Sequence, residues 1–143
     1  MTTPAVEAIC EFLPPFLRFL RQLLAELDLS PARFQVLEAL GQGEALRMVE
    51  LADRLSVTKR NITALVDGLE KDGLVERRPH PADRRSTLIS LTSEGRSVFA
   101  KAARAHSRHL EALLGDLGPQ QRDAMTRALN QLTERLRNES DAG

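Results

Sequence analysis

Residues 51–91 read LADRLSVTKRNITALVDGLEKDGLVERRPHPADRRSTLISL, and this stretch decides the fold. Two helical segments, residues 49–55 and 58–71, are separated by a short turn and precede two short strands, residues 74–78 and 87–91. This pattern is typical of a winged helix-turn-helix. Between the strands, residues 77–85 read RRPHPADRR and carry four arginines against one aspartate. This local excess of positive charge predicts a module that binds nucleic acid.

The composition of the whole chain does not by itself favour nucleic acid. Its 143 residues contain 20 Lys plus Arg and 20 Asp plus Glu, so only the local placement of charge selects a partner. The length favours one domain, or one core with helical extensions. With no Trp, no Tyr and five Phe, the core is left to Leu, Val, Ile and Ala, which favours helices.

Features near the N-terminus predict a soluble protein of the cytoplasm. Cys10 is the only cysteine, so no intramolecular disulfide forms and a reducing compartment is favoured. Glu7 and Glu11 stand where a signal peptide would carry basic residues. The longest apolar run, residues 12–29, contains four charged residues, and we do not expect it to span a bilayer.

Two helices are expected ahead of the central stretch. Residues 6–27 carry apolar side chains at helical spacing, and Pro14 and Pro15 inside this pattern predict a kink or a break. Ser30 and Pro31 form the start signal of a second helix, because a capping hydroxyl is followed by proline at the first helical position. Glycines at 41 and 43 end that helix.

Two more helices are expected behind it. Thr92 is the capping residue of a helix that runs to about Leu117. A last helix, about 119–137, is expected to bury four apolar residues, namely Met125, Leu129, Leu132 and Leu136. The apolar stripes of residues 6–27 and 119–136 exceed what one small core covers, and they therefore predict a homodimer.

These patterns predict a mainly α fold with a small β-hairpin wing, an α+β winged helix with about six helices. Residues 30–95 would form the winged helix-turn-helix module, and residues 1–29 and 96–137 the helical dimerisation region. Residues 138–143 are expected to be a flexible tail.

The helix-turn-helix itself places polar groups for reading bases. Ala52 supplies the small residue where two helices cross, and Val57 supplies the apolar residue of the turn. The second helix is expected to turn Ile62, Leu65, Val66 and Leu69 toward the core. It then presents its N-terminal outer face to the major groove, where Arg and Lys suit guanine and Asn suits adenine. The predicted reading residues are Thr58, Lys59, Arg60, Asn61 and Thr63.

The tip of the hairpin is expected to aim an arginine. Pro79 and Pro81 restrict the residues before them to extended conformations and so stiffen the loop. Asp83 lies two residues before Arg85, and we expect it to pair with the Arg85 guanidinium and direct it into a narrow minor groove.

Three further segments carry a family resemblance together with residues 51–58. They are residues 65–77 (LVDGLEKDGLVER), Asp83-Arg84-Arg85, and residues 91–95 (LTSEG). Over about Glu44 to Arg96 the chain resembles a MarR-type transcriptional regulator. Outside that window the resemblance extends only to the order of the helices.

The resemblance implies a homodimer that binds a pseudo-palindromic operator in double-stranded DNA, with the first and the last two helices of each chain interlocked. It implies that residues 58–61 and Thr63 read the major groove. It also implies that Arg85, oriented by Asp83, enters the minor groove, and that Arg84 and Arg77 hold phosphates. Members mostly repress. Many release DNA when a small phenolic or other aromatic acid binds between the dimer helices and the winged module, which favours a dimer that no longer matches the operator.

Other interpretations remain open. Some relatives sense oxidants through an N-terminal cysteine held by tyrosine hydroxyls; this chain has Cys10 but no tyrosine, and a lone Cys on an apolar stripe more often packs as a small hydrophobe. The fold also serves as a protein-docking module without DNA binding.

Catalysis and metal binding are not expected. His106 and His109 lie one helical turn apart near Glu111 and Asp116, but a third ligand at a convincing spacing is lacking. The chain carries no glycine-rich phosphate loop and no nucleophile motif. We therefore expect neither an enzyme nor a cofactor, apart from a possible aromatic or phenolic effector.

Overall fold

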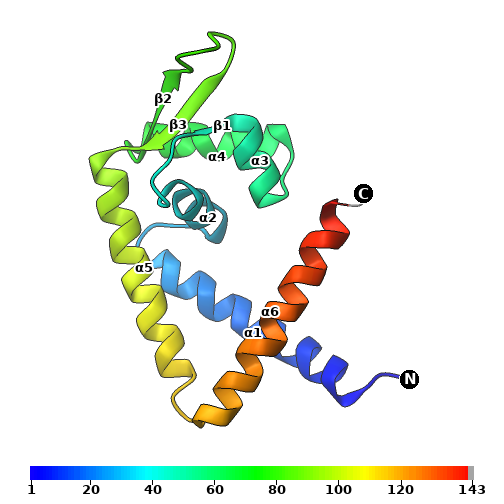
Figure 1. Cartoon of the computed structure of the whole chain (residues 1–143). Coiled ribbons are helices and arrows are strands. Elements are labelled where there is room, and N and C mark those ends of the chain that lie inside the picture. Colours follow the sequence, from blue (N-terminus) through cyan, green and yellow to red (C-terminus); the bar gives the residue numbers. More distant parts are fainter. Residues whose placement is uncertain (142–143) are drawn as a thin grey trace. The chain divides into compact units, whose positions relative to one another are not determined.

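The computed structural model describes residues 1–141, and residues 142–143 lie outside that range. The chain divides into two compact units, residues 1–106 and 107–143, and we describe each by itself. Six helices and three strands form the described chain (Figure 1), in the order α1 (Pro4–Ala25), α2 (Pro31–Leu40), β1 (Leu46–Arg47), α3 (Met48–Leu55), α4 (Lys59–Lys71), β2 (Val75–Pro79), β3 (Thr87–Leu91), α5 (Ser93–Leu113) and α6 (Pro119–Asp141). The predicted mainly α winged-helix fold is confirmed.

Polar side chains cap α2, α4 and α5 at or next to the starts that the sequence predicts. The Ser30 hydroxyl accepts from the Arg33 backbone N–H at 3.1 Å, and Pro31 occupies the first turn of α2. Thr58 caps α4 in the same way through the Asn61 N–H, also at 3.1 Å. The Thr92 hydroxyl caps α5 by accepting from the Gly95 N–H at 3.0 Å. Each cap satisfies a backbone donor that the helix cannot satisfy itself.

The wing belongs to a three-stranded antiparallel sheet in the order β1-β3-β2. Strand β3 lies where it was predicted, with Ile89 and Leu91 buried, and β2 is shifted by one residue from the predicted start at Leu74. Figure 1 shows β2 and β3 as a hairpin that projects beyond α3 and α4. The strand β1 was not predicted, because Leu46 and Arg47 are too few for an alternating pattern, yet Leu46 pairs with Ile89.

The core of the first unit lies between α2, α3, α4 and the sheet. Eight large side chains are almost fully buried there, namely Val36, Leu37, Leu51, Ile62, Val66, Leu69, Val75 and Ile89. The predicted inward face of α4 is confirmed by Ile62, Val66 and Leu69, all at 0% exposure. Because that face is fixed in the core, the opposite face of α4 is held toward solvent.

The first helix corrects the prediction made from its prolines. A kink or a break at Pro14 and Pro15 was expected; α1 continues as one helix through both residues, so the break is ruled out. Proline removes a donor to the carbonyl four residues earlier, here Cys10 and Glu11. Those two residues are exposed, so water can hydrate the freed carbonyls.

The apolar stripe of α1 is mostly uncovered in the single chain. Leu23 and Leu24 are buried, while the N-terminal part of the stripe is exposed at Val6, Ile9, Phe12, Leu13 and Leu17. The described residues include no helix with the combination of length and apolar character that crossing a bilayer requires.

The second unit differs from the prediction at three points. Helix α5 ends at Leu113 rather than near Leu117. Helix α6 continues past the predicted end at Arg137 to Asp141, so the predicted tail is helical over residues 138–141, and residues 142–143 lie outside the described range. The expected burial by α6 is wrong for the single chain, because Leu129, Leu132 and Leu136 are about half exposed or more.

Candidate nucleic-acid interface

The turn between α3 and α4 has the geometry of a helix-turn-helix. Ser56 ends α3 in the left-handed conformation, at φ 51°, and the Val57 N–H donates to the Ala52 carbonyl at 3.1 Å. Ala52 is buried and Val57 packs partly buried against the core, as the sequence predicts. The tight turn therefore fixes where α4 begins.

The predicted reading residues lie together on the first turns of α4. Lys59, Arg60 and Asn61 are exposed, and Thr58 holds the N-terminal turn through its cap. Thr63 is half-buried, and its hydroxyl donates to the Lys59 carbonyl at 2.7 Å, which leaves its oxygen lone pairs as acceptors. The start of α4 thus offers two cations, an amide and a hydroxyl to solvent.

The wing tip corrects the role predicted for Asp83. Its carboxylate accepts from the Arg85 backbone N–H at 3.0 Å and from the Ser86 hydroxyl at 3.2 Å. Within residues 1–141, no ion pair joins the Asp83 carboxylate to the Arg85 guanidinium. Two-residue spacing in a turn brings the backbone N–H closer than the long side chain, so Asp83 holds the turn itself. The His80 N–H donates to the Ser86 carbonyl at 3.0 Å and closes the same loop.

A cavity of about 380 Å³ separates the start of α4 from the wing. It is lined by Arg47, Met48, Val49, Lys59, Thr63, Arg77, Arg85, Ser86 and Thr87. Four of these nine side chains are basic and none is acidic. Two of the four, Lys59 and Arg85, take part in no ion pair within residues 1–141, so the cavity presents positive charge from both elements that a duplex would touch.

Sequence reasoning missed Arg47, which lies in β1 directly before α3. Its guanidinium donates to Glu50 at 3.0 Å, and the same carboxylate oxygen accepts from the Arg47 backbone N–H at 3.1 Å. These bonds from Arg47 hold the pKa of Glu50 below its ordinary value. In the sequence, the only sign of this contact is that Arg47 and Glu50 lie three residues apart. Many pairs of exposed charged residues have the same spacing, so it does not single out Arg47.

Arg77, which the sequence predicts to contact a phosphate, is paired with carboxylates of the protein itself. Its guanidinium forms a close ion pair with Asp67 of α4, and its Nε lies 3.9 Å from Glu70. The neighbouring Arg78 pairs within β2 with Glu76. Among the described residues, Lys59, Arg60, Arg84 and Arg85 take part in no ion pair, so the start of α4 and the wing tip carry positive charge that no carboxylate neutralises.

Comparisons with known proteins agree with this geometry. A model of the MarR family matches residues 27–86. The HTH-type transcriptional repressor YetL of Bacillus subtilis (strain 168) is 36% identical over 110 residues, which cover 76% of this chain and 66% of YetL. The transcriptional repressor CouR, solved on a 23-mer DNA duplex, is 31% identical with a TM-score of 0.79, covering 88% of this chain and 89% of that one. The chain belongs to the MarR family of transcriptional regulators.

A structure of a mutant E. coli MarR complexed with operator DNA adds to the comparison. It is 28% identical to this MarR-family chain, with a TM-score of 0.77, and the match covers 90% of this chain and 93% of that one. The match with YetL spans slightly less than two thirds of that relative's length.

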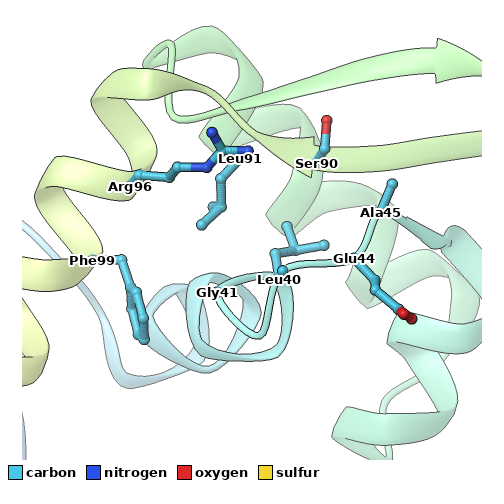
Figure 2. Close-up of a pocket in the computed structure, with 9 residues that line it drawn as sticks. Leu40, Gly41, Glu44, Ala45, Ser90, Leu91, Arg96 and Phe99 are labelled. Carbon is cyan, nitrogen blue, oxygen red and sulfur yellow. The ribbon is translucent and has the colours of Figure 1, made fainter.

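A second cavity of this MarR-family module lies between the end of α2, the loop after it, β3 and the start of α5. Its volume is about 270 Å³. In Figure 2 the apolar side chains of Leu40, Leu91 and Phe99 surround it, Arg96 extends its guanidinium over Leu91, and Glu44 points away. A Cβ on Gly41 would lie 2.5 Å from the Phe99 ring, so the lack of a side chain at Gly41 leaves room for that ring. The cavity combines apolar walls with one cation.

The structure also places Cys10 and His106, the cysteine and histidine candidates from the sequence. Cys10 is exposed on α1, so the expected packing as a small hydrophobe is wrong for the single chain. The His106 ring lies 5.3 Å from the Phe34 ring. Within residues 1–141, no group of three or more His, Cys, Asp or Glu side chains is placed to hold a metal ion.

Proposed function

We propose that this chain is a sequence-specific DNA-binding transcriptional repressor of the MarR type, acting as a homodimer. The basic cavity between α4 and the wing carries the proposal, because it places unopposed cations on both elements that would meet a duplex. The name of YetL as a repressor, and the DNA bound to CouR and to E. coli MarR, support the same function.

Eight of the nine predicted site residues, all but Arg77, have a role in this part of the proposal. Lys59, Arg60 and Asn61 read base edges in the major groove, with Thr58 and Thr63 beside them. Arg85 enters the minor groove and Arg84 holds a phosphate. Asp83 keeps the wing turn in the shape that presents both arginines.

The uncovered apolar stripes support the homodimer. Large apolar residues on α1 and on α6 remain exposed in the single chain, and a solvated monomer rarely leaves such stripes open. A second copy would cover them through residues 1–29 and 96–137, the proposed dimerisation region. Two winged modules would then meet the two half-sites of a pseudo-palindromic operator.

A small effector would release the repressor from DNA. The cavity in Figure 2 supports this part of the proposal, because it offers apolar walls and an aromatic ring to the body of a small acid and Arg96 to its carboxylate. It touches both β3, which leads from the wing, and the start of α5. A ligand that prefers one arrangement of these elements would shift the population of DNA-competent dimers.

The proposed target also sets the compartment. A regulator acts where the chromosome is, which places this protein in the cytoplasm and agrees with its lone, exposed cysteine. The proposal assigns it no catalytic activity.

The DNA part is tested by selecting duplexes from a random pool and measuring affinity for the selected sequence at several salt concentrations. Wild-type affinity should fall steeply with salt. Arg85→Ala should weaken binding at least about 10-fold and reduce the log-log slope by about 0.9 for each phosphate that is no longer neutralised. Lys71→Ala, at the opposite end of α4, is the matched control: Lys71 is exposed and takes part in no ion pair within residues 1–141, so both quantities should stay unchanged. A flat salt response would instead support a protein-docking module.

The effector part is tested by calorimetry with benzoate and hydroxybenzoates. Binding should be lost in Arg96→Gln and weakened in Phe99→Leu, and a ligand that binds should lower operator affinity. Ligands that bind without changing operator affinity would reject release by an effector at this cavity.

A further inference from the structure

The guanidinium of Arg77 lies between the wing and the acidic outer face of α4. It contacts Asp67 closely and approaches Glu70, which lies one helical turn further along α4. The Arg77 side chain is 32% exposed, compared with 69% for Arg78. Its backbone is fixed as well, since Arg77 pairs in register with the fully buried Ile89.

Beyond Arg77 the wing has little else to hold it. None of residues 78–87 is buried, and the Arg78 ion pair stays within β2. The hairpin hydrogen bonds join β2 to β3, but they do not fix the angle between the hairpin and α4. Arg77 is therefore the last charged contact from the wing to the helix that carries the reading residues.

We propose that Arg77 is a positioning residue, which holds the wing at the angle to α4 that lets both elements reach DNA at once. Asp67 and Glu70 are its partners, and the phosphate-binding role expected of Arg77 is replaced by this clamp. The inference rests on the proposed DNA-binding function, because it states how two DNA contacts are kept in register.

The two roles predict opposite results for Asp67→Asn. If Arg77 bound a phosphate, removing the nearby carboxylate would free its guanidinium and reduce repulsion of DNA, so affinity would rise. If Arg77 is a clamp, the same change loosens the wing, so affinity for the selected operator falls. A partly exposed ion pair contributes up to about a factor of five, so two modules on one operator give a loss of up to about 25-fold.

The experiment compares Arg77→Gln, Asp67→Asn and the double variant by fluorescence anisotropy with the selected operator over a salt series. Both single variants should weaken binding to a similar extent, the double variant should be no weaker than either, and the salt slope should stay at the wild-type value. Arg78→Gln and Glu76→Gln are matched controls on the same strand, because their ion pair does not reach α4. Thermal melts confirm that each variant is folded.

A second measurement does not need DNA. Backbone 15N relaxation of the free protein should show greater mobility of residues 80–86 in Arg77→Gln and Asp67→Asn than in the two controls. Tighter operator binding by Asp67→Asn, or a salt slope lowered by about 0.9 in Arg77→Gln, would make Arg77 a phosphate ligand and overturn the clamp. Unchanged wing relaxation would also overturn it. If the wild type binds no duplex, the proposed function fails, while the relaxation data still decide the clamp.

Discussion

The junction between the sheet and α5 depends on Gly95, and Gly95→Ala should damage it. A Cβ built at this residue would lie 1.9 Å from the Leu74 carbonyl oxygen, whereas real Cβ atoms essentially never come closer than 3.0 Å. The neighbour is backbone and not the end of a flexible side chain, so a rotamer change cannot relieve the contact. The start of α5 and the start of β2 must therefore move apart.

The cost follows from what that movement breaks. The Leu74 carbonyl accepts from the Thr92 N–H at 3.1 Å, and the Thr92 hydroxyl donates to the Gly73 carbonyl at 2.6 Å. Forcing extra atoms into a packed site costs about 1–3 kcal/mol, and weakening one of these hydrogen bonds adds about 1 kcal/mol. We expect a loss of about 3 kcal/mol, which for a chain of this length lowers Tm by roughly 10 °C.

Calorimetry or circular dichroism at one fixed protein concentration measures the change, because dimerisation makes Tm depend on concentration. Gly118→Ala is the matched control. Gly118 also lies at a helix start, but a Cβ there would meet nothing nearer than Gln121 Oε1 at 3.9 Å, so Tm should shift by no more than about 3 °C. A Gly95→Ala melt within about 3 °C of the wild type, roughly 1 kcal/mol, would refute the steric argument.

Three further predictions follow from single contacts. Thr58→Ala removes the cap of α4 and should lower the free energy of unfolding, measured by urea denaturation, by about 1 kcal/mol. It should also lower operator affinity, whereas Thr58→Ser should retain both the stability and the affinity. Gly68→Ala puts a Cβ 2.4 Å from Arg33 Nη2 and should break the 2.6 Å pair with Asp72, but the guanidinium can swing away and alanine favours helix, so equilibrium stability should change by less than about 1 kcal/mol. The Arg47 hydrogen bonds lower the pKa of Glu50, so its contribution is present above the ordinary value of 4.5 and is lost as pH falls through the folded-state pKa. Urea denaturation from about pH 7 to about pH 3 should therefore show the wild-type advantage over Glu50→Gln disappearing below pH 4.5, and a constant difference would contradict it.

Local chemistry explains the parts of the fold that the sequence predicts well. The caps at Ser30, Thr58 and Thr92 act within three residues, and the alternation of β3 needs only Ile89 and Leu91 to face inward. Such signals are complete in a short window, so helix starts and the second wing strand can be placed without tertiary knowledge.

The errors arise where distant or solvent contacts decide. Strand β1 exists only because Leu46 meets Ile89, more than 40 residues later, and two residues carry no period of their own. Pro14 and Pro15 did not end α1, because the carbonyls they leave unpaired lie on exposed residues. Asp83 had two possible donors at Arg85, the guanidinium and the backbone N–H, and only the shape of the turn selects the latter.

The same limit governs the candidate site, because arginines look alike in a sequence and differ in what neutralises them. In the winged module, Arg33, Arg47, Arg77 and Arg78 each face a carboxylate, and three of these four pairs join different elements of the chain. Pairing consumes their charge and turns them into structural contacts. In a chain with no net charge, the surface that can attract a polyanion is the one whose cations are not paired with carboxylates. Within residues 30–95, six cations remain outside any ion pair, namely Arg54, Lys59, Arg60, Lys71, Arg84 and Arg85. Four of the six lie at the start of α4 and at the wing tip, so the acidic residues of this protein define its proposed DNA face as much as the basic ones do.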